Sequence, residues 1–264
     1  MKISIIGGGN LGISIAKGIK EAESSYNISV SRRNVHEIKH LEDLGIKVTG
    51  SNIECISDSE IIILSIKPHQ TEEVLLEIKS LLKNQILISV VTGYTFDKII
   101  KNLNDSISVF RAMPNTAISF RESMTCISNF NGSQEQKKIV ESLFNKLGEC
   151  VFIEEKLMDA ATVLDACGVA FALRYIRAAM QGGIQIGFDS ETSLKIVSQT
   201  VKGAATLLLK DTAHPEREID KVTTPQGCTI AGLNEMEHQG FSSALIKGIV
   251  TSYLAIGDIT GKSK

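Results

Sequence analysis

Glycines close to the start of the chain have the spacing of a dinucleotide-binding turn. The sequence GGGNLG places Gly7, Gly9 and Gly12 in the pattern G-x-G-x-x-G, between an apolar strand-like run and a helix-like run. The first glycine of this pattern permits a tight turn, the second lets the backbone approach a pyrophosphate, and the third allows a helix to pack closely on a sheet. A flexible turn without a ligand is the alternative. If a dinucleotide binds, we expect its pyrophosphate against the start of the helix, at Gly9, Asn10 and Leu11.

A pair of arginines follows about twenty residues further on, where NAD-binding sites usually carry an acidic residue. The sequence there is VSRRN, with Arg32 and Arg33 and no carboxylate. A guanidinium group suits a 2′-phosphate, because it forms bidentate, charge-assisted hydrogen bonds. The sequence therefore predicts that NADPH is preferred, with NADH as an alternative cofactor. Two solvated arginines on a surface loop are the other interpretation.

Two further loops follow strand-like runs, and open α/β sheets bind ligands at the carboxyl ends of their strands. The loop SIKPH contains Ser65, Lys67 and Pro68, and the loop MPNTA contains Asn115. Lys67 has the length to reach a cofactor or substrate, and the Asn115 amide offers both a donor and an acceptor. We expect these residues to contribute to the cofactor site, with a structural or surface role as an equal alternative for each.

A second chemical signal lies far from the glycines, in the hydroxyl-rich segment KVTTPQGCTIAG. Pro225 and Gly227 predict a turn, and the residues after them predict the start of a helix. Backbone N–H groups at such a turn and helix start can hold a carboxylate. The segment therefore predicts an anion site, and a helix cap without a ligand is the alternative.

The elements that would position these motifs alternate along the first part of the chain. Apolar, β-branched runs alternate with helix-like patterns, which is typical of βαβ units with a mostly parallel sheet covered on both faces. The strand-like runs are residues 2–7, 27–32, 60–66, 85–91, 107–113, 124–128 and 150–154. We expect a Rossmann-type dinucleotide-binding domain over residues 1–156.

Beyond residue 156 the strand pattern stops, which predicts an all-helical second domain over residues 157–264. The run MDAATVLDACGVAFALRYIRAAMQGGIQIGF, residues 158–188, predicts one long helix that is apolar almost all round and rich in Ala and Gly. A helix without a polar face must be buried on most sides. One small domain offers too little cover, so we expect this helix to pack against a second copy of the chain. We also expect Asp189 or Ser190 to cap the next helix.

Composition excludes several classes of partner. The 264 residues are 43% hydrophobic and 22% charged with a formal net charge of −2, so bulk charge gives no reason to expect a nucleic-acid or membrane partner. The five cysteines are scattered without a CxxC pair, and no signal-like or membrane-spanning run is present, so we expect a cytoplasmic protein with reduced thiols. His36 and His40 share a helical face, but without a third ligand we expect no metal site.

Six motifs spread over both halves of the chain occur together in one known family. They are GGGNLG, SIKPH, RAMPNTA, QTVKGAATLL, HPEREIDKVTTPQGCTIAGL and GFSSALIKG. With these motifs the chain resembles the pyrroline-5-carboxylate reductase family over essentially its whole length. The resemblance implies a Rossmann domain followed by a helical domain through which two subunits intertwine. It also implies the last step of proline biosynthesis, in which hydride from NAD(P)H reduces 1-pyrroline-5-carboxylate, a cyclic imine with a carboxylate, to L-proline.

By the same resemblance, the hydroxyl-rich turn binds the substrate where two subunits meet. The implied substrate-binding residues are Thr224, Gly227, Cys228 and Thr229. Thr229 is the implied catalytic residue, because its hydroxyl would reach the ring nitrogen or the carboxylate. No other side chain is required as a strong general acid, since the imine can take its proton from water.

The chain departs from the family pattern at several positions. Gln226 stands for a glycine and Cys228 for a threonine in the substrate turn, while Val169 and Arg177 stand for a proline and a glutamate further upstream. These departures leave two alternatives, a related NADP-dependent imine or hydroxyacid reductase and a non-catalytic NADP(H)-binding sensor. The hydroxyl-rich turn argues against the sensor, because a sensor needs no second anion site.

Overall fold

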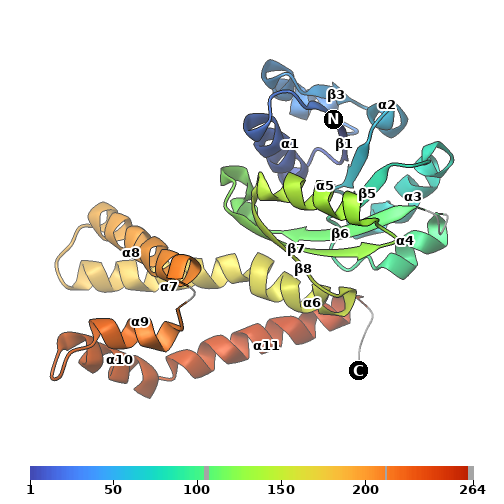
Figure 1. Cartoon of the computed structure of the whole chain (residues 1–264). Helices are drawn as coiled ribbons and strands as arrows, with labels where there is room; N and C mark the ends of the chain where they lie inside the picture. Colours follow the sequence, from blue (N-terminus) through green and yellow to red (C-terminus); the bar gives the residue numbers. More distant parts are fainter. Residues whose placement is uncertain (104–106, 212, 261–264) are drawn as a thin grey trace. The chain divides into compact units, whose positions relative to one another are not determined.

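The computed structural model of the chain describes residues 1–103, 107–211 and 213–260 (Figure 1). The chain divides into two compact units. The first contains Met1–Cys167 together with the segment that begins at Tyr253, and the second contains Gly168–Ser252. Residues 261–264, the end of the predicted helical domain, lie outside the described residues.

An eight-stranded sheet forms the first unit, in the order β3-β2-β1-β4-β5-β6-β7-β8. Its strands are β1 (Lys2–Ile6), β2 (Asn27–Ser31), β3 (Lys47–Thr49), β4 (Ile61–Leu64), β5 (Ile86–Ser89), β6 (Ser108–Pro114), β7 (Ser123–Phe130) and β8 (Gly148–Phe152). The strands β1 to β6 pair in parallel, β7 runs antiparallel to β6, and β8 runs parallel to β7. The predicted Rossmann-type, mostly parallel sheet is confirmed. The sequence pattern did not predict β3, because three residues are too few to show a period.

Helices cover both faces of this sheet, because its central strands are apolar on both faces. These helices are α1 (Asn10–Ala22), the 3₁₀ helix η1 (Val35–Leu44), α2 (Asn52–Ile56), α3 (Pro68–Ile78), α4 (Phe96–Asn102) and α5 (Gln134–Asn145). In β4, Ile61 and Ile63 lie in one core with α1, η1 and α5, whereas Ile62 and Leu64 lie in the other core with α2, α3 and α4. Each of these four side chains is at most 1% exposed, and each contributes about 1.5–3 kcal/mol by burial.

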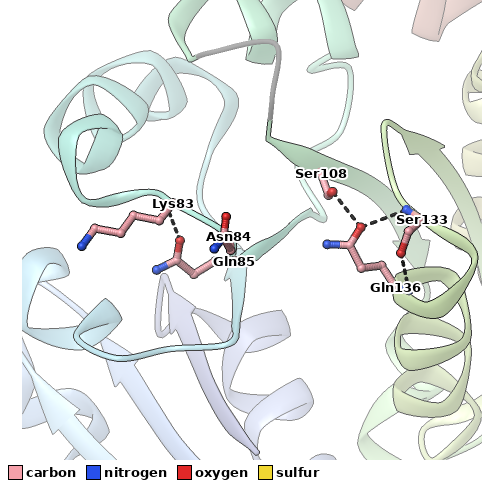
Figure 2. Close-up of a pocket in the computed structure, with 6 residues that line it drawn as sticks. All are labelled: Lys83, Asn84, Gln85, Ser108, Ser133 and Gln136. Carbon is pink, nitrogen blue, oxygen red and sulfur yellow. Dashed lines mark hydrogen bonds between the residues drawn. The ribbon is translucent and has the colours of Figure 1, made fainter.

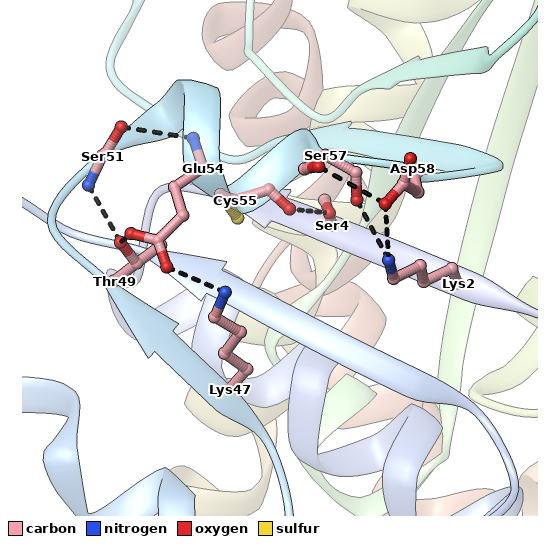
Figure 3. A network of polar contacts seen from close by, with 9 residues as sticks. All are labelled: Lys2, Ser4, Lys47, Thr49, Ser51, Glu54, Cys55, Ser57 and Asp58. Carbon is pink, nitrogen blue, oxygen red and sulfur yellow. Dashed lines mark hydrogen bonds and ion pairs between the residues drawn. The ribbon is translucent and has the colours of Figure 1, made fainter.

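A polar network fixes α2 beside β1 and β3 (Figure 3). Thr49 Oγ1 donates to Glu54 Oε2 at 2.6 Å, and Lys47 Nζ forms an ion pair with Glu54 Oε1 at 2.8 Å. The Glu54 N–H donates to Ser51 Oγ at 3.2 Å, which caps α2. Cys55 is buried in this network, and burial raises the pKa of its thiol to about 11, so it is not a reactive thiolate.

The predicted continuous helix over residues 158–188 is wrong in one respect, because a π-helix interrupts it. The run contains α6 (Met158–Ala161), the π-helix η5 (Thr162–Cys167) and α7 (Gly168–Gln185). A π-helical turn is common at functional sites. Here it places Asp165 within hydrogen-bond distance of Asn115, a contact between residues 50 apart that a local hydrophobic pattern does not report.

The second unit is all-helical, as predicted. It is built from α7, α8 (Ser190–Asp211), α9 (Pro215–Val222), α10 (Cys228–His238) and most of α11 (Phe241–Thr260). Asp189 Oδ1 accepts from the N–H groups of Glu191 and Thr192 at 3.0 and 2.9 Å, so Asp189 caps α8. Ser193 Oγ donates to Met180 O at 2.9 Å, which ties α8 to α7.

Most large apolar side chains of the second unit are exposed in the single chain. Among its described residues, Ser193 alone is buried. The exposed apolar side chains include Leu173, Ile186, Leu194, Leu209, Leu245 and Ile246. Exposed apolar surface on this scale marks an interaction site. It is what the expected packing against a second copy of the chain requires.

Over the described residues, no single helix has the length and apolar character to cross a membrane. Two consecutive helices, Cys228–His238 and Phe241–Gly257, meet that criterion only as a pair, and they are bent by 48° relative to each other.

Candidate active site

The predicted cofactor residues of the first unit gather at one edge of the sheet. They lie in loops that follow β1, β2, β4 and β6, and these strands run parallel within one sheet. Gly7 follows β1 and Ser65 follows β4, and the Ser65 N–H donates to Ile6 O at 2.8 Å. The order of strands reverses at the β1–β4 pair, which is where open α/β sheets bind their ligands.

Packing explains two of the three glycines in the first loop. Gly7 has a φ of +110°, and a Cβ there would lie 2.1 Å from Ser65 O. A Cβ on Gly12 would lie 2.0 Å from Gly7 O, so α1 could not approach β1 as closely. By contrast, a Cβ on Gly9 would meet no atom within 4 Å. The space beside Gly9 is therefore open, as the predicted approach of a pyrophosphate to this backbone requires.

The start of α1 offers backbone donors to an anion. No side chain caps this helix. The N–H groups of Gly7 and Gly8 donate to Ser31 O at 3.1 and 2.8 Å, which fixes the loop against the end of β2. The N–H groups of Asn10 and Leu11 belong to the first helical turn, where no intrahelical acceptor exists. Together with the helix dipole they suit pyrophosphate oxygens, so the residues present fit a dinucleotide cofactor.

Arg32 and Arg33, which are expected to bind a 2′-phosphate, are each paired with a carboxylate. Arg32 Nη1 donates to Gly8 O at 2.6 Å, and Arg32 Nη2 forms an ion pair with Glu37. Arg33 Nη2 lies 3.6 Å from Glu73 Oε2, and both of these side chains are exposed. Glu37 was not among the predicted site residues. Its position five residues after Arg32 could have indicated an ion pair between the two side chains. A negative charge therefore lies beside the predicted 2′-phosphate site.

Lys67 and Pro68 begin α3 at the same edge. Pro68 is the first helical residue and Lys67 is the N-cap, and both are exposed. The Lys67 ammonium group makes no ion pair with any described residue, so it remains available to a ligand. Ser65 is half-buried, and its backbone closes the turn at Gly7. Cofactor contacts by these side chains stay a prediction.

Asn115 is held at the end of β6 by hydrogen bonds within the chain. Its Nδ2 donates to Asp165 Oδ1 at 2.6 Å, and its Oδ1 accepts from the Ala117 N–H at 2.9 Å. Its own N–H donates to Ser123 Oγ at 3.0 Å. Both ends of the amide are thus engaged, which gives Asn115 a structural role whether or not it also contacts a cofactor. The sequence analysis missed its partner Asp165, because the contact depends on the π-helix.

In the second unit, the hydroxyl-rich segment forms a turn followed by α10. The Gly227 N–H donates to Thr224 O at 2.9 Å, and Gln226 between them has a φ of +58°. Gly227 is the N-cap of α10, and no side chain caps that helix. A Cβ on Gly227 would lie 2.5 Å from Thr224 Oγ1, so the Thr224 hydroxyl lies beside the helix start. Cys228 and Thr229 are the first two helical residues, so all four predicted substrate residues lie together.

The Thr229 hydroxyl makes no hydrogen bond with the described residues. Other helical threonines behave differently, since Thr200 Oγ1 donates to Ile196 O at 2.9 Å and Thr206 Oγ1 donates to Lys202 O at 2.8 Å. Thr229 is the second residue of α10, so no helical carbonyl lies four residues before it. Thr229 is half-buried as a residue, and its hydroxyl remains available to a ligand at the helix start.

Two family models match the chain. One, described as pyrroline-5-carboxylate reductase dimerisation, matches residues 155–256. The other, described as NADP oxidoreductase coenzyme F420-dependent, matches residues 2–93. Pyrroline-5-carboxylate reductase 2 of Dictyostelium discoideum is 46% identical over 95% of this chain and 90% of its own length. The chain belongs to the pyrroline-5-carboxylate reductase family.

Solved pyrroline-5-carboxylate reductases have the same fold. The enzyme from Coxiella burnetii superposes with a TM-score of 0.90 at 27% identity, over 97% of both chains. The Plasmodium falciparum pyrroline carboxylate reductase, solved with NADP bound, superposes with a TM-score of 0.86 at 25% identity, over 100% of this chain and 98% of that chain. A further relative, pyrroline-5-carboxylate reductase 1 of Dictyostelium discoideum, is also 46% identical, but the chain spans only 48% of its length. The predicted family and fold are confirmed.

Membership of the pyrroline-5-carboxylate reductase family indicates the class of reaction and the formation of an oligomer. The family consists of NAD(P)H-dependent oxidoreductases that carry out the last step of proline biosynthesis. The dimerisation match extends from α6 through α7, α8, α9 and α10 into α11, and large apolar side chains of α7 to α11 are exposed in the single chain. These two observations together support a homo-oligomer.

A pocket of about 330 Å³ lies at the amino ends of β5, β6 and α5, away from the carboxyl ends of the strands where the predicted cofactor residues lie. It is lined by Lys83, Asn84, Gln85, Ser108, Ser133 and Gln136 (Figure 2). Gln136 Oε1 accepts from Ser108 Oγ at 2.8 Å and from the Ser133 N–H at 2.9 Å, so these lining groups satisfy one another. No cluster of three or more His, Cys, Asp or Glu side chains suited to a metal ion occurs among the described residues.

Proposed function

We propose that this chain reduces 1-pyrroline-5-carboxylate to L-proline with hydride from NADPH. Membership of the reductase family supports the reaction class, and the turn at residues 224–229 supports the substrate class. That turn combines backbone N–H groups at a helix start with two threonine hydroxyls, which suits a small carboxylate beside a ring nitrogen. This combination is the observation that carries the proposal, because a protein that only binds NADP(H) needs no such second site.

The two predicted domains divide the work in this proposal. Residues 1–156 bind the cofactor, and residues 157–264 bind the substrate and the second subunit. The proposed cofactor-binding residues are Gly7, Gly9, Asn10, Leu11, Gly12, Arg32, Arg33, Ser65, Lys67, Pro68 and Asn115. The proposed substrate-binding residues are Thr224, Gly227, Cys228 and Thr229. NADPH is the expected cofactor, supported by the relative solved with NADP bound, and NADH remains an alternative.

The chain's own residues mainly bind and orient the reactants. The N–H groups at the start of α10 hold the substrate carboxylate. The Thr229 hydroxyl donates to the carboxylate or to the neutral ring nitrogen, and it accepts from the ring N–H once the imine is protonated. The imine takes its proton from water, and its positive charge makes the neighbouring carbon electrophilic. NADPH supplies the hydride when it is bound. Good placement of two reactants can lower a barrier by about 7–11 kcal/mol, so no strong general acid is required.

The proposed enzyme works as a homo-oligomer in the cytoplasm, joined through its helical domain. The exposed apolar side chains of α7 to α11 support that interface. A formal net charge of −2 gives no electrostatic reason for a nucleic-acid or membrane partner. A small molecule is therefore the expected substrate and a second copy of the chain the expected partner.

The test is a comparison of substrates in an NADPH-oxidation assay. Purified chain is assayed with 1-pyrroline-5-carboxylate, with other cyclic imines and with 2-oxo acids. We expect kcat/KM for 1-pyrroline-5-carboxylate to exceed that of every other compound by at least about tenfold. Faster turnover of another compound would favour a related reductase, and binding of NADPH without turnover of any compound would favour a sensor.

A further inference from the structure

A carboxylate that the sequence analysis missed lies at the place where the cofactor's 2′-phosphate is expected. We propose that Glu37 competes with the 2′-phosphate of NADPH for Arg32, and so narrows the preference of this chain for NADPH over NADH. The inference rests on the proposed function, because it assumes a dinucleotide on the glycine loop. It concerns a specificity-determining residue outside the expected phosphate-binding set.

Arg32 is fixed on several sides by the chain itself. Its backbone N–H donates to Thr49 O at 3.0 Å, and its Nη1 donates to Gly8 O at 2.6 Å. Its Nη2 forms the ion pair with Glu37. Because Gly8 belongs to the glycine loop, the guanidinium group lies next to the expected pyrophosphate site. A phosphate group that binds Arg32 through Nη2 must therefore displace the Glu37 carboxylate or share the Nη2 group with it.

Glu37 is held in place by a second donor. Asn34 Nδ2 donates to Glu37 Oε1 at 2.8 Å, while Glu37 Oε2 faces Arg32. The Glu37 N–H donates to Asn34 O at 3.3 Å, which fixes the first turn of η1. Both carboxylate oxygens thus have donors within the chain, so the negative charge has a defined position. About half of the Glu37 side chain is exposed, so a bound nucleotide can reach it.

The second arginine also has a carboxylate partner. Arg33 pairs with Glu73 at 3.6 Å, and their side chains are 77% and 74% exposed. An exposed ion pair of this kind contributes little, and solvent screens it strongly. Each arginine of the expected phosphate site thus has its own carboxylate, and the two pairs together carry no surplus positive charge.

A 2′-phosphate and a 2′-hydroxyl interact with Glu37 in opposite ways. A phosphate monoester carries a charge of about −1.5 to −2 at pH 7, so Glu37 repels it while Arg32 attracts it. A ribose 2′-hydroxyl has a proton to donate, and a carboxylate is a strong acceptor for it. Glu37 therefore disfavours NADPH and favours NADH at the same position, while Arg32 does the reverse.

The variant Glu37→Gln separates these effects, because glutamine keeps the shape and removes the charge. Isothermal titration calorimetry of the full chain with 2′,5′-ADP and with 5′-AMP isolates the 2′-phosphate from the nicotinamide. Loss of one charge a few ångströms from a phosphate should raise the affinity for 2′,5′-ADP about 3- to 10-fold. The affinity for 5′-AMP should stay the same or fall by up to about twofold. The ratio of the dissociation constants for NADH and NADPH should change by the same factor as the ratio for 5′-AMP and 2′,5′-ADP.

Glu42→Gln is the matched control. Glu42 lies on η1 like Glu37 and is exposed, and it forms no ion pair with any described residue. Glu42→Gln changes the net charge by the same amount as Glu37→Gln. The ratio of its dissociation constants for 5′-AMP and 2′,5′-ADP should therefore match that of the wild type. The inference is overturned if Glu37→Gln leaves that ratio unchanged, or if Glu42→Gln shifts it as much.

A second background tests whether Glu37 acts through Arg32. In a chain that carries Arg32→Met, the guanidinium group for which Glu37 and the phosphate compete is absent. The further change Glu37→Gln should therefore no longer raise the affinity for 2′,5′-ADP by the same factor. An undiminished gain in that background would overturn the inference. Failure of the wild-type chain to bind NADPH and NADH would refute the proposed function itself, whereas binding of both with a ratio insensitive to Glu37 refutes only the role of Glu37.

Discussion

Asn115 Nδ2 donates to Asp165 Oδ1 at 2.6 Å, which joins the end of β6 to the π-helix η5. Asp165 Oδ2 is buried and has no hydrogen-bond partner among the described residues. Burial raises the pKa of Asp165 to about 6 from 3.8, and the hydrogen bond from Asn115 opposes the shift. Because this pKa is raised in the folded state, folding is favoured by the protonated carboxyl. That contribution is complete below about pH 4 and is lost as the pH rises through 6.

We expect Asp165→Asn to remove this dependence on pH. A shift of about two units corresponds to about 3 kcal/mol, and partial exposure of the carboxyl reduces the expected effect to about 1 kcal/mol. The free energy of unfolding of the wild type should therefore fall by about 1 kcal/mol relative to Asp165→Asn between about pH 4 and pH 7. Urea denaturation at one fixed protein concentration measures it.

Asp43→Asn is the control for this titration, because Asp43 is an exposed carboxylate on η1. The same urea denaturation of Asp43→Asn at each pH gives the effect of removing one exposed carboxylate. A difference between the wild type and Asp165→Asn that is the same at every pH would contradict the expectation.

The second prediction concerns a buried arginine and its ion pair. Arg111 in β6 is 2% exposed, and its Nη1 lies 2.9 Å from Glu155 Oε1. The same oxygen accepts from the Phe96 N–H at 2.6 Å, at the start of α4. Glu155→Gln keeps an acceptor for that N–H but leaves the buried guanidinium without a counter-charge. We expect it to lower the free energy of unfolding by about 2–4 kcal/mol, measured by urea denaturation.

Two further variants test the cause of that loss. Glu154→Gln removes a carboxylate of an exposed pair with Lys156 and should change stability by less than about 1 kcal/mol. Arg111→Met combined with Glu155→Gln removes both charges and should recover part of the loss, since no unpaired charge remains buried. If the double variant is less stable than Glu155→Gln alone, the ion pair is not the reason for the loss.

The third prediction is that substitutions at two glycines of the first loop have different effects, one on stability and the other on cofactor binding. Gly12→Ala places a Cβ 2.0 Å from Gly7 O, so α1 must move and stability should fall by about 3 kcal/mol. Gly9→Ala places a Cβ in open space at a φ of −82°, which any residue adopts, so stability should stay within about 0.5 kcal/mol of the wild type. The affinity of Gly9→Ala for NADPH should nevertheless fall about tenfold or more, because the methyl group occupies the expected pyrophosphate site.

Melting temperatures and calorimetric titration with NADPH distinguish the two variants. Wild-type affinity in Gly9→Ala would remove Gly9 from the cofactor site. An equal loss of stability in both variants would show that Gly9 also has a packing role.

Local features of the chain were predictable because they depend on neighbouring residues. All strands of the sheet except β3 follow from apolar runs between turns, and the cap of α8 by Asp189 follows from residue type and position. The positive φ of Gly7 and the close contact of Gly12 with Gly7 O follow from a motif within a few residues, although Gly7 also packs against the distant Ser65. Features that join distant segments were not predictable. The π-helix and the contact of Asp165 with Asn115 involve residues 50 apart, and no period in the sequence reports such a contact.

The partners of the two arginines after β2 were also not predictable from the motif. Because no carboxylate lies at the end of that strand, the sequence predicts a 2′-phosphate site at these arginines, with two solvated surface arginines as the alternative. The chain instead turns into η1 and brings Glu37 back to Arg32. The motif therefore indicates the edge of the sheet, but the ion pair of Arg32 at that edge depends on the direction of η1, which the motif does not report.

The last prediction concerns Thr229, whose hydroxyl has no partner among the described residues and lies at the uncapped start of α10. Thr229→Ala should raise KM for 1-pyrroline-5-carboxylate and lower kcat/KM about tenfold or more, because one hydrogen bond to a charged substrate is lost. The free energy of unfolding should change by less than about 0.5 kcal/mol, since no hydrogen bond within the described chain is broken. Thr229→Ser keeps the hydroxyl and should restore most of kcat/KM. Thr206→Ala, which removes a hydroxyl bonded to Lys202 O, should leave kcat/KM unchanged. A wild-type kcat/KM in Thr229→Ala would exclude Thr229 from the substrate site, whatever the other variants show.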